Sequence, residues 1–181
     1  MGTIKDTSGE YLDRQRVEIE NLMPWEVGFP TRTMNGEGCI LNGGNYIYLQ
    51  DKDEYQYKRG ISKMTVEEIC AQINAGNIGF VGRDGAGQHA CIRINDLELY
   101  KTVFDLPDAK ELPLQLTQEA VGNLLKISNA KKFEEELKKL VVTQSEKKAF
   151  AHFASYYPKL NEMPLAIIRK IEEHIGLNIS E

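Results

Sequence analysis

Four tyrosines and three carboxylates are concentrated in one short segment of the 181-residue chain. The residues are Tyr46, Tyr48, Asp51, Asp53, Glu54, Tyr55 and Tyr57. Tyrosine combines a large rigid apolar ring with a polar end, and it is enriched where proteins bind other proteins. Carboxylates beside such rings attract basic groups. We therefore predict that these residues form a partner-binding surface for a basic protein or a nucleoprotein.

The spacing of the tyrosines indicates how they are presented. Residues two apart on an extended segment point to the same face, so Tyr46 and Tyr48 share one face, opposite Ile47. Tyr55 and Tyr57 have the same spacing. The pattern leaves an alternative open, in which one of the two pairs faces a helix in the core instead of a partner.

A glycine-rich segment, Gly85 to Ala90, has the spacing of a dinucleotide-binding loop. Such a loop binds pyrophosphate only where it opens a helix, whose free N–H groups meet the anion. Here the β-branched alternation that follows predicts a strand, and Asp84-Gly85 favours a tight turn. We therefore predict a hairpin over residues 79–94 and expect no nucleotide or other cofactor.

Other residues that could perform chemistry lack the required spacing. His89 and Cys91 lie two apart on the predicted strand, which separates their Cβ atoms by roughly 6–7 Å, too far for a thiol and its base. The acidic residues 51–54 lack the spacing of a calcium-binding EF-hand loop. The sequence also contains no common hydrolase motif. We expect a protein that is not an enzyme and has neither catalytic nor metal-binding residues.

The charge of the chain is unevenly distributed. Residues 1–110 contain 12 Lys and Arg against 17 Asp and Glu, while residues 111–181 contain 10 of each, which accounts for the net charge of −5. An acidic surface argues against broad binding to phosphate backbones and is compatible with a basic partner. Three widely spaced cysteines, Cys39, Cys70 and Cys91, indicate reduced thiols, and we therefore expect a cytoplasmic protein.

Hydrophobic periodicity predicts an α+β fold, with a small antiparallel β-sheet and two short helices followed by a helical segment of about four helices. Residues 17–20 alternate as a strand, and residues 39–41 and 46–49 are expected to form a hairpin across a Gly-rich turn. Thr65 and Glu68 have the spacing of a capping box that begins a helix, and Asp96 caps a second one.

Prolines and alternating charges make residues 105–113 the predicted boundary between two domains. We expect a flexible N-terminal arm at residues 1–16, an α+β domain at 17–110 and a helical domain at 111–181. Thr117, Ser128 and Thr143 are the predicted N-caps of successive helices in the last of these.

Residues 117–133 resemble the helix-turn-helix of bacterial regulators. The turn position that is usually Gly is Lys126, and Glu134 to Glu136 on the second helix would repel phosphates. We therefore favour a plain αα-hairpin with at most weak direct DNA binding, and leave contact of residues 117–142 with DNA as an open alternative.

The run from Val17 to Leu22 leading to Val27-Gly28-Phe29, the Gly-rich β region and the helix at Phe133 to Leu137 resemble small proteins encoded by phages and prophages of gut Firmicutes. That group includes virion proteins and type II anti-CRISPR proteins that bind Cas9. The resemblance implies a non-enzymatic protein in the cytoplasm of a bacterial host cell that occupies a protein or nucleoprotein surface. In its most specific form it implies an anti-CRISPR inhibitor of Cas9 with its guide RNA. A phage virion structural or assembly protein, located in the virion, and a helix-turn-helix regulator are the alternatives.

Overall fold

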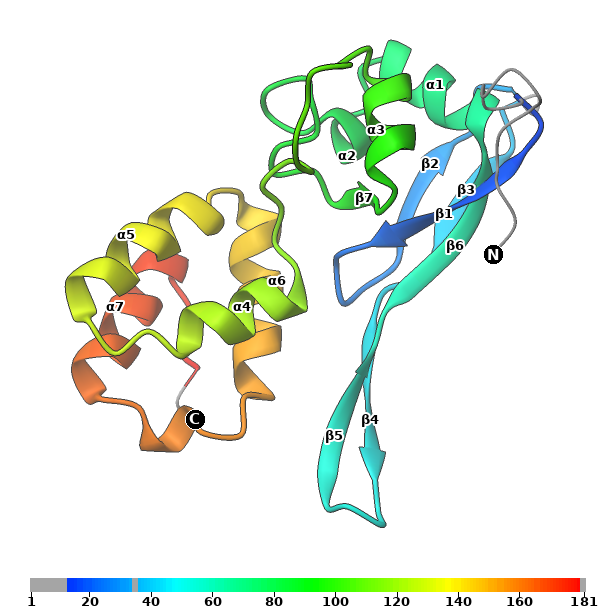
Figure 1. Cartoon of the computed structure of the whole chain (residues 1–181). Coiled ribbons are helices and arrows are strands. Elements are labelled where there is room, and N and C mark those ends of the chain that lie inside the picture. Colours follow the sequence, from blue (N-terminus) through cyan, green and yellow to red (C-terminus); the bar gives the residue numbers. More distant parts are fainter. Residues whose placement is uncertain (1–12, 34–35, 180–181) are drawn as a thin grey trace.

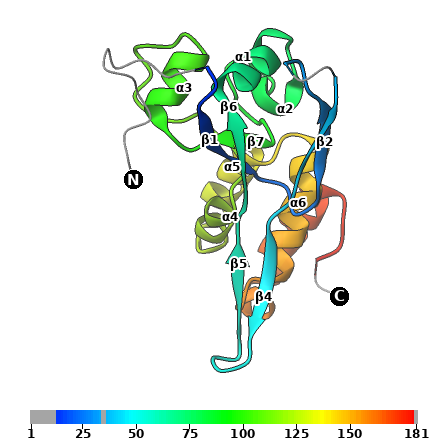
Figure 2. The same cartoon turned by 90° about the vertical axis from the view of Figure 1, so that its right-hand side faces the viewer.

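The computed structural model describes residues 13–33 and 36–179, and its helices and small antiparallel sheets confirm the predicted α+β fold. Two compact units are visible in Figure 1, an α+β unit built from the first part of the chain and a helical unit built from the last. A long β-hairpin extends away from the α+β unit and passes beside the helical unit (Figures 1 and 2).

The α+β unit is organised around a three-stranded antiparallel sheet. Its strands lie in the order β6 (Gly60–Thr65), β1 (Arg16–Asn21) and β7 (Ile92–Ile94). The helices of this unit are α1 (Val66–Asn74), α2 (Ile78–Val81) and α3 (Leu97–Val103). Alternation in β1 buries Val17 and Ile19 while Glu18 stays exposed, as the sequence predicts. Glu20 departs from the alternation, because it is buried and its carboxylate accepts hydrogen bonds from Arg59 and Asn95. The buried face packs with Ile69 and Leu99 from the helices.

The helix starts in this unit follow the sequence, with one correction. The Thr65 side chain accepts a hydrogen bond from the Glu68 N–H at the start of α1, and Asp96 caps α3 in the same way. The Glu68 carboxylate does not complete a capping box, because it accepts hydrogen bonds from the backbone N–H groups of Arg32 and Thr33. Burial alone would raise the pKa of Glu68, but the hydrogen bonds from Thr33, Gln72 and the backbone outweigh it, so the pKa is lowered.

The hairpin predicted over residues 79–94 is wrong, because only its second strand forms and that strand, β7, pairs with β1. Residues 78–81 form the one-turn helix α2, because Asn77 accepts a hydrogen bond from Gly79 N–H and caps it. A loop with positive φ at Gly82, Gly85 and Gly87 follows, and only then does strand β7 begin. A short apolar run such as Ile78 to Val81 satisfies a helical turn as well as a strand. The glycine loop therefore leads into a strand, as expected, and comes out of a helix.

The hairpin predicted between residues 39–41 and 46–49 is also wrong. Strand β3 (Gly38–Leu41) pairs with β2 (Val27–Pro30), whereas β4 (Asn45–Leu49) pairs with β5 (Glu54–Lys58). Gly43 and Gly44, between β3 and β4, and Gly60, at the start of β6, lie where segments of backbone cross at close range, and we call this place the glycine crossing. A Cβ on Gly43 would lie 2.6 Å from the Trp25 nitrogen, and one on Gly60 would lie 2.4 Å from the Asn42 carbonyl oxygen.

The helical unit contains four α-helices and one short 3₁₀ turn. These are α4 (Gln118–Leu125), α5 (Ala130–Leu140), α6 (Gln144–Ser155), η1 (Leu160–Glu162) and α7 (Leu165–Ile175). Thr117 caps α4, and Thr143 with Glu146 forms a complete capping box on α6, as predicted. The prediction for α5 is wrong by one residue, because Asn129 caps it and Ser128 does not. No helix of the described residues is long and apolar enough to cross a membrane.

Each unit has its own buried cluster of apolar side chains. One includes Ile19, Ile69 and Phe80, and the other includes Phe133 and Phe150 of the helical unit. Residues 1–12 of the predicted arm lie outside the described residues. Its end is tied to the fold, because residues 13 and 15 accept hydrogen bonds through their backbone carbonyls from the first turn of α1. The division at residues 105–113 into separate domains stays a prediction.

Candidate partner-binding site

The predicted site residues all lie on the β4–β5 hairpin. Its antiparallel register places Tyr46 opposite Tyr57 and Tyr48 opposite Tyr55. Because directly opposite residues point to the same side of a two-stranded ribbon, all four tyrosines share one face. We call Tyr46 and Tyr57 the inner pair, since they lie next to the glycine crossing, and Tyr48 and Tyr55 the outer pair.

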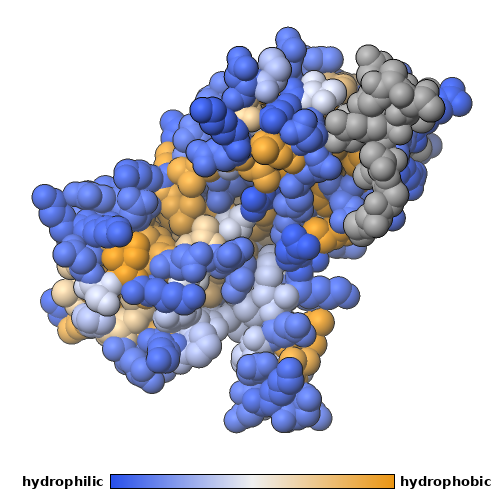
Figure 3. Space-filling view, viewed as in Figure 1, coloured by the Kyte–Doolittle hydropathy of each residue, from blue (hydrophilic) through white to orange (hydrophobic). Residues whose placement is uncertain are grey.

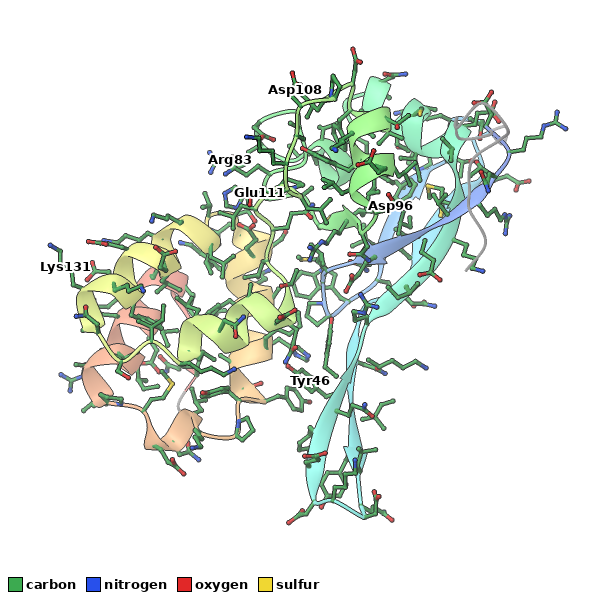
Figure 4. The ribbon with its side chains drawn as sticks, viewed as in Figure 1. Tyr46, Arg83, Asp96, Asp108, Glu111 and Lys131 are labelled. Carbon is green, nitrogen blue, oxygen red and sulfur yellow. The ribbon has the colours of Figure 1, made fainter. Side chains whose placement is uncertain are left out.

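The inner pair packs against the C-terminal half of α6. The Tyr46 ring stacks on Tyr156 with a centroid distance of 4.0 Å and an interplanar angle of 11°, and Tyr57 meets Phe153 edge-on at 5.6 Å. Both inner tyrosines are half-buried at the edge of the helical core. Figure 4 shows Tyr46 between the hairpin and the helical unit. For the inner pair, therefore, the alternative of packing on a helix is the one that the fold adopts.

The outer pair lies beyond the end of α6 and is exposed. Tyr48 is 46% exposed and Tyr55 is 56% exposed, with their ring centroids 5.2 Å apart. One edge contact links them to the helical unit, from Tyr55 to Tyr156 at 5.1 Å. Figure 3 shows the end of the hairpin standing clear of the helical unit. The two tyrosine pairs, which the sequence could not distinguish, thus have different environments.

The carboxylates Asp51, Asp53 and Glu54 are all exposed at the turn of the hairpin. Lys52 stands among them, so three negative charges and one positive charge leave the turn at −2. The Tyr48 hydroxyl donates a hydrogen bond to the Asp53 carboxylate. Asp53 has a φ of 51°, in the left-handed region that Asp tolerates better than most residues. The turn therefore places negative charge directly beside the outer tyrosines.

The pKa values of three phenols on this face are raised. Burial, with a smaller contribution from the Glu20 carboxylate, raises the pKa of Tyr57 to about 12. Burial also raises the pKa of Tyr46, whereas the hydrogen bond to Asp53 is the main cause of the raised pKa of Tyr48. These three phenols are consequently uncharged at neutral pH, whereas the turn carries charged side chains.

Close backbone contacts fix the root of the hairpin. Gly44 donates its N–H to the Met23 carbonyl, and a Cβ on Gly44 would lie 2.0 Å from the Tyr57 hydroxyl oxygen. Gly60, the first residue of β6, is similarly confined by the Asn42 carbonyl. These glycines allow the ribbon to leave the α+β unit at a defined angle and bring the inner tyrosines onto α6.

Sequence analysis missed the contribution of α6 to this site. Phe153 belongs to an apolar stripe that is typical of a buried helix face, but nothing in the sequence connects it with residues about 100 positions earlier. Tyr156 lies at the C-cap of α6 and contacts both Tyr46 and Tyr55. Its position after a helix that carries Phe150 and Phe153 was the only available signal.

A second contact joins the two units at the opposite end of α6. His89 Nδ1 lies 2.8 Å from Glu146 Oε1, and both side chains are almost fully buried. The other Glu146 oxygen accepts hydrogen bonds from the backbone N–H groups of Val142 and Thr143. His89 is thus engaged with the helical unit. Burial raises the pKa of Cys91 to about 11, so this thiol is protonated at neutral pH.

The helices α4 and α5 form the αα-hairpin at residues 117–142. On α5, Lys138 pairs with Glu134 as the spacing suggests, whereas Lys139 pairs with Glu136. Glu134 also pairs with Lys170 of α7, and hydrogen bonds from the two lysines lower the pKa of Glu134 to about 2. Part of the basic charge of this face is thereby committed to ion pairs within the helical unit. Whether the face contacts DNA stays a prediction.

Comparison of the chain with protein-family models, with curated proteins and with solved structures finds no match. The fold and the candidate site by themselves define an α+β protein with a projecting β-hairpin. Within the described residues, no group of three or more His, Cys, Asp or Glu side chains is arranged to hold a metal ion.

Proposed function

We propose that the protein is a non-enzymatic binding protein of a phage or mobile element, which acts by occupying a surface of a basic protein or nucleoprotein partner. The most specific version of the proposal is that the protein inhibits Cas9 bound to its guide RNA. The observation that supports it is the β4–β5 hairpin, whose free end carries two exposed tyrosines and a turn with a charge of −2. We place its action in the bacterial cytoplasm, where the free thiols Cys39, Cys70 and Cys91 stay reduced.

The anchoring of the hairpin supports this proposal. An isolated two-stranded ribbon is at best marginally stable in water, so a free hairpin would lose conformational entropy on binding. Here the inner pair and the glycine crossing hold the root, and the outer pair and the turn extend from it. Because the end of the hairpin is already ordered, less of the free energy of binding is lost to ordering it when a partner binds.

A Cas9 cleavage-protection assay tests the proposal with matched charge variants. Asp51→Lys with Glu54→Lys reverses two exposed charges at the turn, while Asp53 is left in place because its φ of 51° disfavours lysine. Glu119→Lys with Glu135→Lys makes the same change of net charge on exposed positions of the helical unit. We expect the turn variant to lose protection and to bind more slowly at low salt, because charges at an interface rim steer association. The control variant should protect like the unchanged protein.

Two results would contradict the proposal at different levels. Absence of protection at excess protein removes Cas9 as the partner and leaves the virion alternative, which electron microscopy of phage particles with labelled protein can examine. Equal protection by the turn variant and the unchanged protein shows that the hairpin end is not the contact.

A second pair of substitutions tests the regulator alternative. Lys131→Ala with Lys132→Ala, two exposed positions on α5, should leave protection intact. Nanomolar, sequence-dependent duplex binding that this change abolishes would favour the regulator.

A further inference from the structure

The outer tyrosines are the exposed end of a continuous series of aromatic rings. Tyr48 contacts Tyr55 at 5.2 Å, Tyr55 contacts Tyr156 at 5.1 Å, and Tyr156 stacks on Tyr46 at 4.0 Å. The inner part of this series is covered by α6, and the interface there is built from ring against ring. The outer part presents the same kind of surface, and the described residues of this chain leave about half of it exposed. Tyr48 and Tyr55 therefore extend the aromatic interface between the hairpin and α6 onto an exposed surface.

The chemistry of this exposed surface indicates which type of partner group would bind it. The face of a phenol ring carries the negative part of the aromatic quadrupole, so it attracts a cation placed within about 6 Å of the ring centre. The three carboxylates at the turn favour the same sign of charge. Ring faces and carboxylates are independent features, and both are complementary to a positive side chain.

A positive side chain of a partner is arginine or lysine, and the geometry favours arginine. A guanidinium is planar, so it can stack flat on a ring while its N–H groups reach a carboxylate. Asp53 is placed for the second contact, because its carboxylate accepts the hydrogen bond from the Tyr48 hydroxyl and so lies at the edge of that ring. An ammonium group offers a point charge without a flat surface and gains less from two adjacent tyrosines.

We infer that the outer pair is an arginine-binding platform, on which a guanidinium of the partner stacks against Tyr48 or Tyr55 while the carboxylates of the turn bind its N–H groups. This rests on the proposed function and deepens it, because it names the side chain of the partner that the hairpin recognises. It also assigns Tyr156 a positioning role, since this ring supports Tyr55 from the side of the helical unit.

The test uses the full chain and three synthetic peptides that alternate glycine with arginine, with lysine or with citrulline. Citrulline has nearly the shape of arginine without its charge, and lysine has the charge without the planar group. Affinities are measured by calorimetry, and the binding surface by NMR of protein labelled in its tyrosine rings. We expect the arginine peptide to bind more tightly than the lysine peptide by up to about fivefold, the upper end of the gain for an exposed cation–π contact. It should shift the signals of Tyr48 and Tyr55, and the citrulline peptide should not bind.

Paired variants separate the rings from the charges. Tyr48→Leu with Tyr55→Leu keeps apolar area but removes the quadrupole, so the preference for arginine over lysine should disappear. Tyr55→Phe keeps both ring faces and the hydrogen bond from the Tyr48 hydroxyl to Asp53, and should retain it. Thermal unfolding of both variants checks that the exposed positions leave the fold intact. Equal affinity of the unchanged protein for arginine and lysine peptides, or an unchanged preference in the leucine variant, would overturn the inference.

The outcome is separable from that of the proposed function. If Cas9 protection holds but the arginine preference is missing, the hairpin is the contact and the platform is wrong. If the arginine peptide binds with the expected preference but Cas9 is not protected, the platform stands and the proposed partner is wrong.

Discussion

The two tyrosine pairs of the β4–β5 hairpin share residue type, spacing and strand register, yet one pair is structural and the other is exposed. The inner pair is half-buried against Phe153 and Tyr156, whereas Tyr48 and Tyr55 are about half exposed. The difference arises from α6, which ends at Ser155 and covers the ribbon only as far as the ring of Tyr156. Position relative to a neighbouring element, and not the strand pattern, decides which tyrosines stabilise the fold and which are available to a partner.

The largest expected effect is at the crossing that orients the hairpin. In Gly60→Ala the new Cβ would lie 2.4 Å from the Asn42 carbonyl oxygen, so a backbone must move and we expect a loss of about 3 kcal/mol of unfolding free energy. Gly122→Ala is the control, because this helical glycine has open space around it and should gain about 0.5–1 kcal/mol. Urea denaturation of both variants measures the difference. A Gly60→Ala protein as stable as the parent would contradict the close crossing.

A smaller effect distinguishes the two tyrosine pairs directly. Tyr57→Ala removes a ring that contacts Tyr46 and Phe153, and should cost about 2 kcal/mol, less than a fully buried ring. Tyr55→Ala removes an exposed ring with edge contacts and should cost no more than about 1 kcal/mol. The same denaturation experiment compares them. Equal losses would show that the helical unit supports the hairpin along its whole length.

Alkaline titration separates the two causes that raise the tyrosine pKa values. Unfolded tyrosine ionises near 10, and burial raises the pKa of Tyr57 to about 12. Between these values the unfolded chain loses a proton that the folded protein keeps. The stability contributed by Tyr57 is therefore complete below pH 10 and lost as the pH rises towards 12. Unfolding measured across this range should show the loss, and Tyr57→Phe should reduce it.

The same titration reports on the turn. The pKa of Tyr48 is raised mainly by its hydrogen bond to Asp53, so Asp53→Asn should bring it back towards its ordinary value and leave that of Tyr57 unchanged. Ultraviolet absorbance of the variant and the parent follows the ionisation. A shift of the Tyr57 pKa in this variant would show that the root and the turn are coupled.

The smallest effect on stability is expected at the turn itself. Asp53→Gly relieves a φ of 51° at the cost of the Tyr48 hydrogen bond, so the unfolding free energy should change by less than about 1 kcal/mol. Binding of the arginine peptide should weaken nonetheless, because a carboxylate is lost. Thermal unfolding and calorimetry on the same variant check both expectations. A large loss of stability would make Asp53 a structural residue of the turn.

Sequence analysis placed the seven candidate residues in one segment but could not tell that the two tyrosine pairs have different environments. The seven predicted residues all lie on one hairpin, because an alternating pattern with a polar turn is a local signal. The partners that define the inner pair, Phe153 and Tyr156, lie about 100 residues away. Their contact depends on how two units pack, which no local pattern contains.

Local chemistry by itself determined several elements of this protein. The N-caps Thr65, Asp96, Thr117 and Thr143 follow from hydrogen bonds within three residues, so the sequence predicts them correctly. The existence of strand β1 follows from a local apolar pattern, although its partners lie far away in the sequence. Glycine is different, because its missing Cβ permits both a tight turn and a close crossing of backbones. Only the tertiary structure decided that Gly43, Gly44 and Gly60 form a crossing, and with it which strands pair and which tyrosines remain exposed.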